Sequence, residues 1–228
     1  MANVGIVSDS NVDLPEEVIK KLDIGIVPGR IIFGDEEVRR HYVDITYEEF
    51  YHRLVHDKAT PSTSVPSPKE YLLAYEEALK KYDEIIVFCT SSKLSSMFNI
   101  ASLVAKDYFK DNVTVIDSQK ISIPFGTIVY EIAVKAREGA SKGELLAYFN
   151  DYLVPKTHAL GGIPTLTYLQ KGGRIGKAAS LMGNFMQVKP IISIENGELT
   201  SLGKVRGMEK IYSLLSDFCK SYFQKETP

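Results

Sequence analysis

The stretch Glu-Ile-Ile-Val-Phe-Cys-Thr-Ser-Ser-Lys-Leu-Ser-Ser at 84–96 decides the fold of the first part of the chain. Its apolar run at 85–89 is typical of a strand that is buried on both faces of a sheet. Similar runs lie at 4–7, 24–27 and 113–116, and helix-like segments separate them. Strands that alternate with helices of roughly 10–15 residues predict a mainly parallel sheet with flanking helices.

Helix starts between these strands carry a capping pattern, in which a polar residue is followed three positions later by Glu. The pattern begins at Asp13, Thr46, Ser67 and Ser141. A side-chain oxygen and the Glu carboxylate then satisfy the first free amides of the helix. The stretch at 58–68, which is rich in Thr, Ser and Pro, is the most linker-like segment of the chain.

The pattern changes near residue 156. Asn196-Gly197 separates two strand-like runs, which predicts a tight hairpin because both central residues need positive φ. We therefore expect an α/β domain at 1–155, followed by a smaller α+β domain with an antiparallel sheet at 156–228. The final helix should have one core face, because apolar residues recur at helical spacing. These residues are Met208, Ile211, Tyr212, Leu215, Phe218, Cys219 and Tyr222.

The composition restricts the class of protein. The chain has 228 residues, of which 44% are hydrophobic and 25% charged, and its formal net charge is −2. It lacks the surplus of Lys and Arg that a general nucleic-acid binder needs, so we expect no nucleic-acid partner. Cys89 and Cys219 are expected to be buried thiols, which suits a reducing compartment. With neither a signal-peptide pattern nor an apolar run of about 20 residues, the chain is expected to be cytoplasmic.

Several enzyme motifs fail on their residues, so we expect no catalytic residue, cofactor or metal. His52 and His56 have the spacing of metal ligands, but Arg53 lies where a zinc protease carries Glu and no third ligand is recognisable. The turn at 172–178 resembles a phosphate loop but is one residue short. Ala178 also replaces the hydroxyl that would bind magnesium. A basic turn of this kind could still present Arg174 to an anion.

Hydroxyl side chains cluster after the predicted strands and before helices, at 8–11, 63–67, 90–96 and 117–118. In an open parallel sheet, ligands bind outside the carboxyl ends of the strands. Helix N-termini at that rim favour a carboxylate or phosphate. A helix cap needs one hydroxyl, whereas Thr63-Ser64 and Ser91-Ser92 are doubled. The sequence therefore predicts a cleft that binds an anionic small molecule.

Longer motifs carry a family resemblance across nearly the whole chain. Val-Ser-Asp-Ser-Asn-Val-Asp-Leu-Pro-Glu-Glu at 7–17 is followed in family order by Thr-Ser-Val-Pro-Ser-Pro at 63–68 and Ser-Ser-Lys-Leu-Ser-Ser at 91–96. Val-Ile-Asp-Ser at 115–118, Leu-Thr-Tyr-Leu-Gln-Lys-Gly-Gly-Arg-Ile-Gly at 166–176 and Lys-Pro-Ile-Ile at 189–192 complete the set. Together they closely resemble the DegV family.

The resemblance implies a protein that holds a long-chain fatty acid in a cleft between two domains. In Gram-positive bacteria such proteins are the acyl-carrying subunit of fatty acid kinase, and a separate catalytic subunit phosphorylates the carboxylate. This chain is then a lipid-binding subunit and not an enzyme, with transient contact to a membrane surface compatible with its role. By motif position, Arg174 lies near the head group or in the kinase-docking surface. The implied carboxylate-binding residues are Thr63, Ser64, Ser91, Ser92 and Lys93, the last through its backbone amide.

The chain departs from the family pattern in three places. Lys93 replaces a usual glycine and would be strained at positive φ. Gly161-Gly162 replaces larger residues, which would widen the second domain, and the chain ends at Pro228 where relatives continue, so that domain is expected to be shortened. Two alternatives stay open. One is a ligand-free interaction or regulatory module, and the other is a phosphoryl-transfer enzyme that acts alone through the turn at 172–177.

Overall fold

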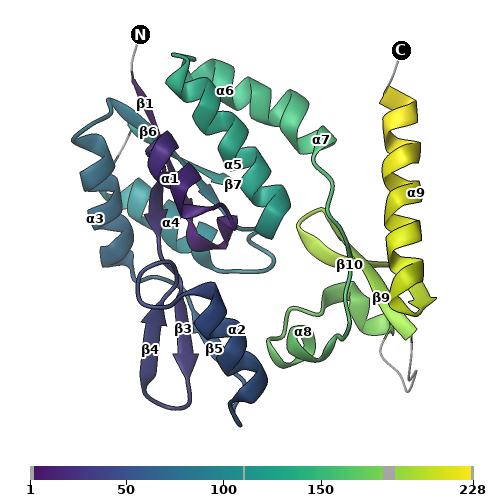
Figure 1. Ribbon diagram of the computed structural model, residues 1–228. Coiled ribbons are helices and arrows are strands. Elements are labelled where there is room, and N and C mark those ends of the chain that lie inside the picture. Colours follow the sequence, from purple (N-terminus) through teal and green to yellow (C-terminus); the bar gives the residue numbers. More distant parts are fainter. Residues whose placement is uncertain (1–2, 110, 182–187, 227–228) are drawn as a thin grey trace. The chain divides into compact units, whose positions relative to one another are not determined.

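The computed structural model describes residues 3–109, 111–181 and 188–226 (Figure 1). The chain divides into two compact units, Met1–Thr157 and His158–Pro228. The first unit is an α/β unit and the second a smaller unit with an antiparallel sheet.

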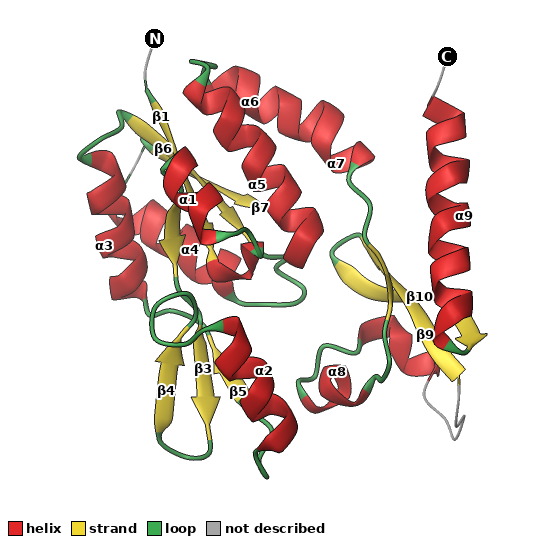
Figure 2. Ribbon diagram, viewed as in Figure 1, coloured by secondary structure: helices red, strands yellow, loops and turns green. Residues whose placement is uncertain are grey.

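A four-stranded parallel sheet with the order β2-β1-β6-β7 forms the centre of the first unit (Figure 2). Its strands are β1 (Val4–Asp9), β2 (Gly25–Val27), β6 (Glu84–Cys89) and β7 (Val113–Asp117). The predicted parallel sheet is confirmed. Its core strand is buried on both faces, because Ile85 and Val87 pack into one core cluster while Ile86 and Phe88 pack into the other. Cys89 is buried, as expected.

Helices cover both faces of this sheet. The side chains of α3 (Pro68–Leu79) and α4 (Met97–Tyr108) pack against the face that carries Ile85 and Val87. The opposite face is covered by α1 (Glu16–Leu22), α5 (Ser122–Arg137) and α6 (Lys142–Tyr148), which continues through a π-helical turn at Phe149–Leu153 into α7 (Val154–Lys156). This arrangement leaves the carboxyl ends of the strands to the loops.

A small antiparallel sheet in the first unit was not predicted. Its order is β4-β3-β5, with β3 (Arg30–Phe33), β4 (Glu37–Arg40) and β5 (Ser62–Ser64), and α2 (Tyr47–His56) lies beside it in the first unit. The linker interpretation of 58–68 is therefore wrong, because Thr63 pairs with Ile31 in β3. A strand that reads Ser-Thr-Ser shows no apolar alternation, so its pattern gives no strand signal.

The predicted helix caps differ in outcome. Thr46 accepts a hydrogen bond from the Glu49 amide, and Ser141 forms the complete capping box with Glu144, so both predictions are confirmed. The Asp13 cap is wrong. Pro15 occupies the N-cap of α1, and Asp13 adopts a left-handed conformation with φ 46°. Residues before a proline favour extended backbone, which delays the helix start.

The second unit is built on a three-stranded antiparallel sheet with the order β10-β9-β8. Its elements are β8 (Leu160–Gly162), α8 (Thr167–Lys171), a 3₁₀ segment at Gly176–Leu181, β9 (Val188–Glu195), β10 (Glu198–Arg206) and α9 (Met208–Glu226). The hairpin prediction is confirmed, with φ 49° at Asn196 and 80° at Gly197. The expected widening at Gly161-Gly162 is wrong. A Cβ on Gly162 would lie 2.2 Å from Ile211 Cγ2, so the Ile211 side chain already fills that space.

The prediction that α9 has a buried face is wrong for most of its described side chains. Ile211 is 2% exposed, but Tyr212 is 65% exposed, and Cys219 is also exposed rather than buried. A helix of 19 residues is about 28 Å long. Three strands span only about 14 Å, so much of the helix has no sheet to cover. The Met208 side chain lies outside the described residues.

Candidate functional site

Polar side chains gather at the carboxyl ends of β1, β6 and β7, as predicted from the hydroxyl clusters. Because these three strands are neighbours in the sheet, their ends form one continuous rim. Six polar side chains of the rim are buried. The buried polar residues of this rim are Ser8, Asp9, Ser10, Thr90, Ser91 and Ser118.

Asp9 lies at the centre of the rim and connects two strands. Its Oδ2 accepts a hydrogen bond from the Thr90 amide (2.6 Å), and its Oδ1 accepts one from Thr90 Oγ1 (2.9 Å) and one from the Asn11 amide (2.9 Å). Burial raises the pKa of Asp9 to about 6, although these hydrogen bonds oppose the rise. The sequence shows Asp9 only as one member of a polar cluster. Its signal was a charged residue at the end of a buried strand.

Asn11 extends the network toward the start of α4. Its Nδ2 donates to Thr90 Oγ1 at 3.1 Å and lies 3.5 Å from Met97 Sδ. Gly29 packs into the same region, where a Cβ would lie 3.0 Å from Met97 Cε, 3.3 Å from Ser10 Oγ and 4.0 Å from the Ser64 carbonyl. The end of β5 therefore lies beside the rim.

The loop after β6 holds three of the predicted carboxylate-binding residues. Ser91 is buried, its amide donates to the Lys120 carbonyl at 2.9 Å, and its Oγ accepts a long hydrogen bond of 3.3 Å from the Lys93 amide. The Ser92 amide lies 3.3 Å from Asp117 Oδ1. The expected strain at Lys93 is wrong, because Lys93 is not among the described residues with positive φ.

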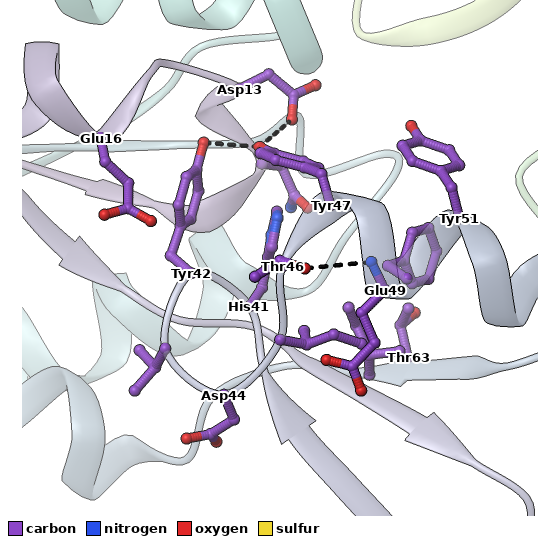
Figure 3. A pocket seen from close by; sticks show the side chains of 15 residues that line it. Asp13, Glu16, His41, Tyr42, Asp44, Thr46, Tyr47, Glu49, Tyr51 and Thr63 are labelled. Atoms are coloured by element: carbon purple, nitrogen blue, oxygen red, sulfur yellow. Dashed lines mark hydrogen bonds between the residues drawn. The ribbon is translucent and has the colours of Figure 1, made fainter.

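Thr63 lies in a cavity of about 540 Å³ that also includes Asn11 in its lining (Figure 3). Natural small-molecule sites commonly have volumes of about 300–1,000 Å³. Ile31, Ile45 and Phe50 contribute apolar lining, so the cavity combines an apolar wall with the Thr63 hydroxyl. Asn11 thus connects this cavity with the rim.

The predicted hydroxyls differ in how they are used. Ser91 Oγ accepts a hydrogen bond within its own loop. The hydroxyls of Thr63, Ser64 and Ser92 form no hydrogen bond with any residue that the structure describes. Thr63 is exposed and Ser92 is half-buried. These hydroxyls are therefore available to a ligand.

The far side of the cavity is aromatic and acidic. His41 stacks on Tyr42 with the ring centroids 4.5 Å apart, and burial lowers the pKa of His41. Tyr47 Oη lies 2.9 Å from Tyr42 Oη and 3.3 Å from Asp13 Oδ1, as Figure 3 shows. No Lys or Arg belongs to the described lining, which holds four carboxylates: Asp13, Glu16, Asp44 and Glu49. Glu16 and Asp44 are ion-paired with Lys20 and Arg40 outside the lining, so Asp13 and Glu49 carry the charge that opposes an anion there.

The comparisons with known proteins identify the family. The model of the DegV family of uncharacterised proteins matches residues 3–228. A DegV domain-containing protein of Caldanaerobacter subterraneus is 34% identical over 221 residues, which cover 97% of this chain and 78% of the relative. The chain belongs to the DegV family.

Solved DegV structures share the fold. A DegV family protein of Thermus thermophilus, described for its fatty acid binding, aligns with a TM-score of 0.88 and 30% identity, covering 96% of this chain and 78% of that one. A stearic acid-binding protein of Eubacterium ventriosum aligns with the same TM-score and identity, covering 100% of this chain and 78% of that one. Both confirm the predicted α/β fold with its additional antiparallel sheet.

Arg174 of the DegV chain belongs to a different unit from the other predicted site residues. It follows α8 in the second unit, whereas the other five lie in the first. The turn is made by Gly173 with φ 72°, and Arg174 Nη1 donates to the Gly172 carbonyl at 2.6 Å. Its exposed position leaves the guanidinium on the surface of the second unit.

The histidine pair lies on the exposed surface of α2, consistent with a solvated helix face. The rings of His52 and His56 stack at 4.4 Å, and His56 Nδ1 lies 2.7 Å from the His52 carbonyl. In the part of the chain that the structure describes, no group of three or more His, Cys, Asp or Glu could hold a metal ion. None of its described helices is long and apolar enough to cross a membrane.

Proposed function

We propose that this DegV chain binds a long-chain fatty acid, with the carboxylate held by the hydroxyls of Thr63 and Ser92 and by the backbone amide of Lys93, which exchanges its long bond to Ser91 Oγ for one to the ligand. Ser64 and Ser91 complete the two loops. The observation that carries the proposal is that the Thr63 and Ser92 hydroxyls have no hydrogen-bond partner among the described residues. Similar proteins of this fold are described as fatty-acid-binding or stearic acid-binding.

The charge distribution supports this orientation of the ligand. Asp13 and Glu49, the lining carboxylates that are in no described ion pair, oppose a fatty carboxylate on the aromatic side. The loop that contains Ser92 leads directly into α4, which begins at Met97 and has 12 residues. The N-terminus of such a helix attracts an anion through its free amides and its dipole.

The tail and the head group of the fatty acid contribute differently to the free energy of binding. Each buried methylene contributes about 0.8 kcal/mol, so a tail of about 16 carbons contributes about 12 kcal/mol before the ordering costs are subtracted. A hydrogen bond to a carboxylate adds about 1.5–3 kcal/mol. The tail therefore dominates affinity, and the hydroxyls orient the carboxylate.

A carrier of this kind presents its carboxylate to a separate kinase subunit, and we assign the docking role to Arg174. Its position after two glycines on an exposed turn suits recognition of an acidic partner surface. The same turn lacks the length and the hydroxyl of a phosphate loop. Phosphoryl transfer by this chain alone is therefore disfavoured.

Titration of the delipidated protein with palmitate and with hexadecanol tests the head-group assignment. We expect Thr63→Val and Ser92→Ala each to weaken palmitate binding about tenfold and to leave hexadecanol binding within about twofold, because each removes a hydrogen bond to the carboxylate. Ser62→Ala is the matched control, since Ser62 is also an exposed hydroxyl of β5 but alternates to the other face of the strand.

Three results would contradict the proposal. Wild-type affinity for palmitate in both variants would exclude these hydroxyls from the site. No uptake of any fatty acid by the delipidated protein would favour the ligand-free interaction module. Turnover of ATP by the isolated chain would favour the phosphoryl-transfer enzyme.

A further inference from the structure

We propose that Asp9 is the positioning residue of the head-group site, fixing the loop that carries Ser92 through Thr90 and the wall of the Thr63 cavity through Asn11. The inference rests on the proposed carboxylate site. It adds a residue that touches no ligand but sets the geometry of those that do.

Both oxygens of the Asp9 carboxylate are committed to the rim. Oδ2 accepts from the Thr90 amide at 2.6 Å, and Oδ1 accepts from Thr90 Oγ1 at 2.9 Å and from the Asn11 amide at 2.9 Å. Asn11 Nδ2 closes the triangle by donating to Thr90 Oγ1 at 3.1 Å. Each of the donors therefore has a defined direction. The side chain is fully buried, so water does not compete for these bonds.

The triangle adjoins the loop that carries Ser92 and borders the cavity that contains Thr63. Thr90 directly precedes Ser91, whose amide is fixed on the Lys120 carbonyl, and Ser92 follows. Asn11 lines the cavity that contains Thr63. One carboxylate thus joins the turn that contains Asn11 to Thr90, 81 residues away in the sequence.

Part of this network serves the fold, because Asp9 caps the 3₁₀ turn Ser10–Val12 through the Asn11 amide, while its bonds to Thr90 tie that turn to the loop after β6. The described ion pairs do not include Asp9, so no Lys, Arg or His compensates its charge there. Desolvation raises its pKa to about 6, which makes ionisation at neutral pH costly. The titratable groups near enough to respond to its charge are Cys89 on β6 and Tyr71 on α3. Burial is the main cause that raises both pKa values, so both groups are neutral at pH 7. For Cys89 the charges of Asp9 and then Asp117 follow, and for Tyr71 the charge of Cys89 comes before that of Asp9.

Protonation would disturb the geometry in a defined way. A protonated oxygen becomes a donor, and each Asp9 oxygen faces a backbone amide that is also a donor. Asp9→Asn introduces the same conflict at every pH, because its Nδ2 must face either the Thr90 amide or the Asn11 amide. The head-group loops should then lose their alignment while the apolar cavity stays in place.

The test uses the full, delipidated chain and compares wild type with Asp9→Asn at pH 5.5 to 8, with palmitate and hexadecanol as ligands. We expect Asp9→Asn to weaken palmitate binding about tenfold at pH 7.5 and to change hexadecanol binding by less than about twofold. In wild type the ratio of palmitate affinity to hexadecanol affinity should fall as pH falls through about 6, because Asp9 becomes protonated. In Asp9→Asn the ratio should show no change that arises from this residue. The titration of palmitate itself is common to both proteins and cancels in the comparison.

Two further variants keep the proposal testable if Asp9→Asn does not fold. Thr90→Val removes one hydrogen bond to Asp9 and should weaken palmitate binding more than hexadecanol binding. Thr90→Ser retains the hydroxyl and should bind both ligands as wild type does. Equal losses for palmitate and hexadecanol would overturn the positioning role and leave a structural one. An unchanged palmitate affinity and pH profile would also overturn it. If wild type binds hexadecanol but not palmitate, the carboxylate site itself is absent and the proposed function fails first.

Discussion

Gly126→Ala tests how the packing of α5 supports the rim. Gly126 is buried in α5, and a Cβ there would lie 2.3 Å from the Val12 carbonyl oxygen and 3.3 Å from Leu14 Cδ2. A backbone oxygen cannot rotate away, so α5 and the segment at 12–14 must separate. Overpacking of this kind costs about 1–3 kcal/mol, while alanine returns up to about 1 kcal/mol of helix propensity. We expect a net loss of about 1–2 kcal/mol in the free energy of unfolding.

Gly143→Ala is the matched control for this substitution. Gly143 is an exposed glycine of α6 with no heavy atom within 4 Å of the added Cβ, so the variant should gain about 0.5–1 kcal/mol. Urea unfolding followed by helical circular dichroism measures both. Val12 follows Asn11, so a displacement of Val12 should also move Asn11. Gly126→Ala should therefore weaken palmitate binding more than hexadecanol binding. An unfolding midpoint for Gly126→Ala at or above that of Gly143→Ala would refute the reasoning.

Three further predictions concern stability. Gly162→Ala should destabilise the second unit by about 1–3 kcal/mol, whereas Gly161→Ala should cost less, since its Cβ would lie 3.7 Å from Ile192 Cγ1. Because the pKa of Asp9 is raised to about 6 in the folded state, its contribution to stability is complete below pH 4 and is lost as pH rises through about 6. Chemical denaturation between pH 4 and 7.5 should therefore show that wild type loses up to about 3 kcal/mol of unfolding free energy relative to Asp9→Asn. Ser141→Ala should cost about 1 kcal/mol and lower the thermal midpoint. Equal unfolding midpoints for Gly162→Ala and Gly161→Ala would contradict the first prediction. A stability difference between wild type and Asp9→Asn that does not change with pH would contradict the second, and a wild-type thermal midpoint in Ser141→Ala would contradict the third.

Local patterns in the sequence were enough to predict the main architecture. The apolar run at 85–89 is buried on both faces because it is the core strand of a parallel sheet. Asn196-Gly197 specifies its hairpin because both residues take positive φ. In each case a few adjacent residues determine the geometry, so no long-range information is needed.

The remaining features depend on contacts between distant segments. The strand at 62–64 exists because it pairs with β3, and its own Ser-Thr-Ser sequence has no strand pattern. The environment of Asp9 depends on Thr90, which is 81 residues away. The periodicity of α9 also led to a wrong prediction. An apolar stripe indicates which face of a helix can be buried, but it does not indicate how much sheet is available to cover that face. The doubled hydroxyls at Thr63-Ser64 and Ser91-Ser92 were visible, but the residue that positions them was not.

Native mass spectrometry of the purified full chain, before and after delipidation and reloading with palmitate, tests the central claim most directly. The proposed function predicts a species that is heavier than the bare chain by one fatty acid, its loss on delipidation, and its return with palmitate at one molecule per chain. A chain that carries no acyl mass as purified and takes up no palmitate after delipidation would contradict it.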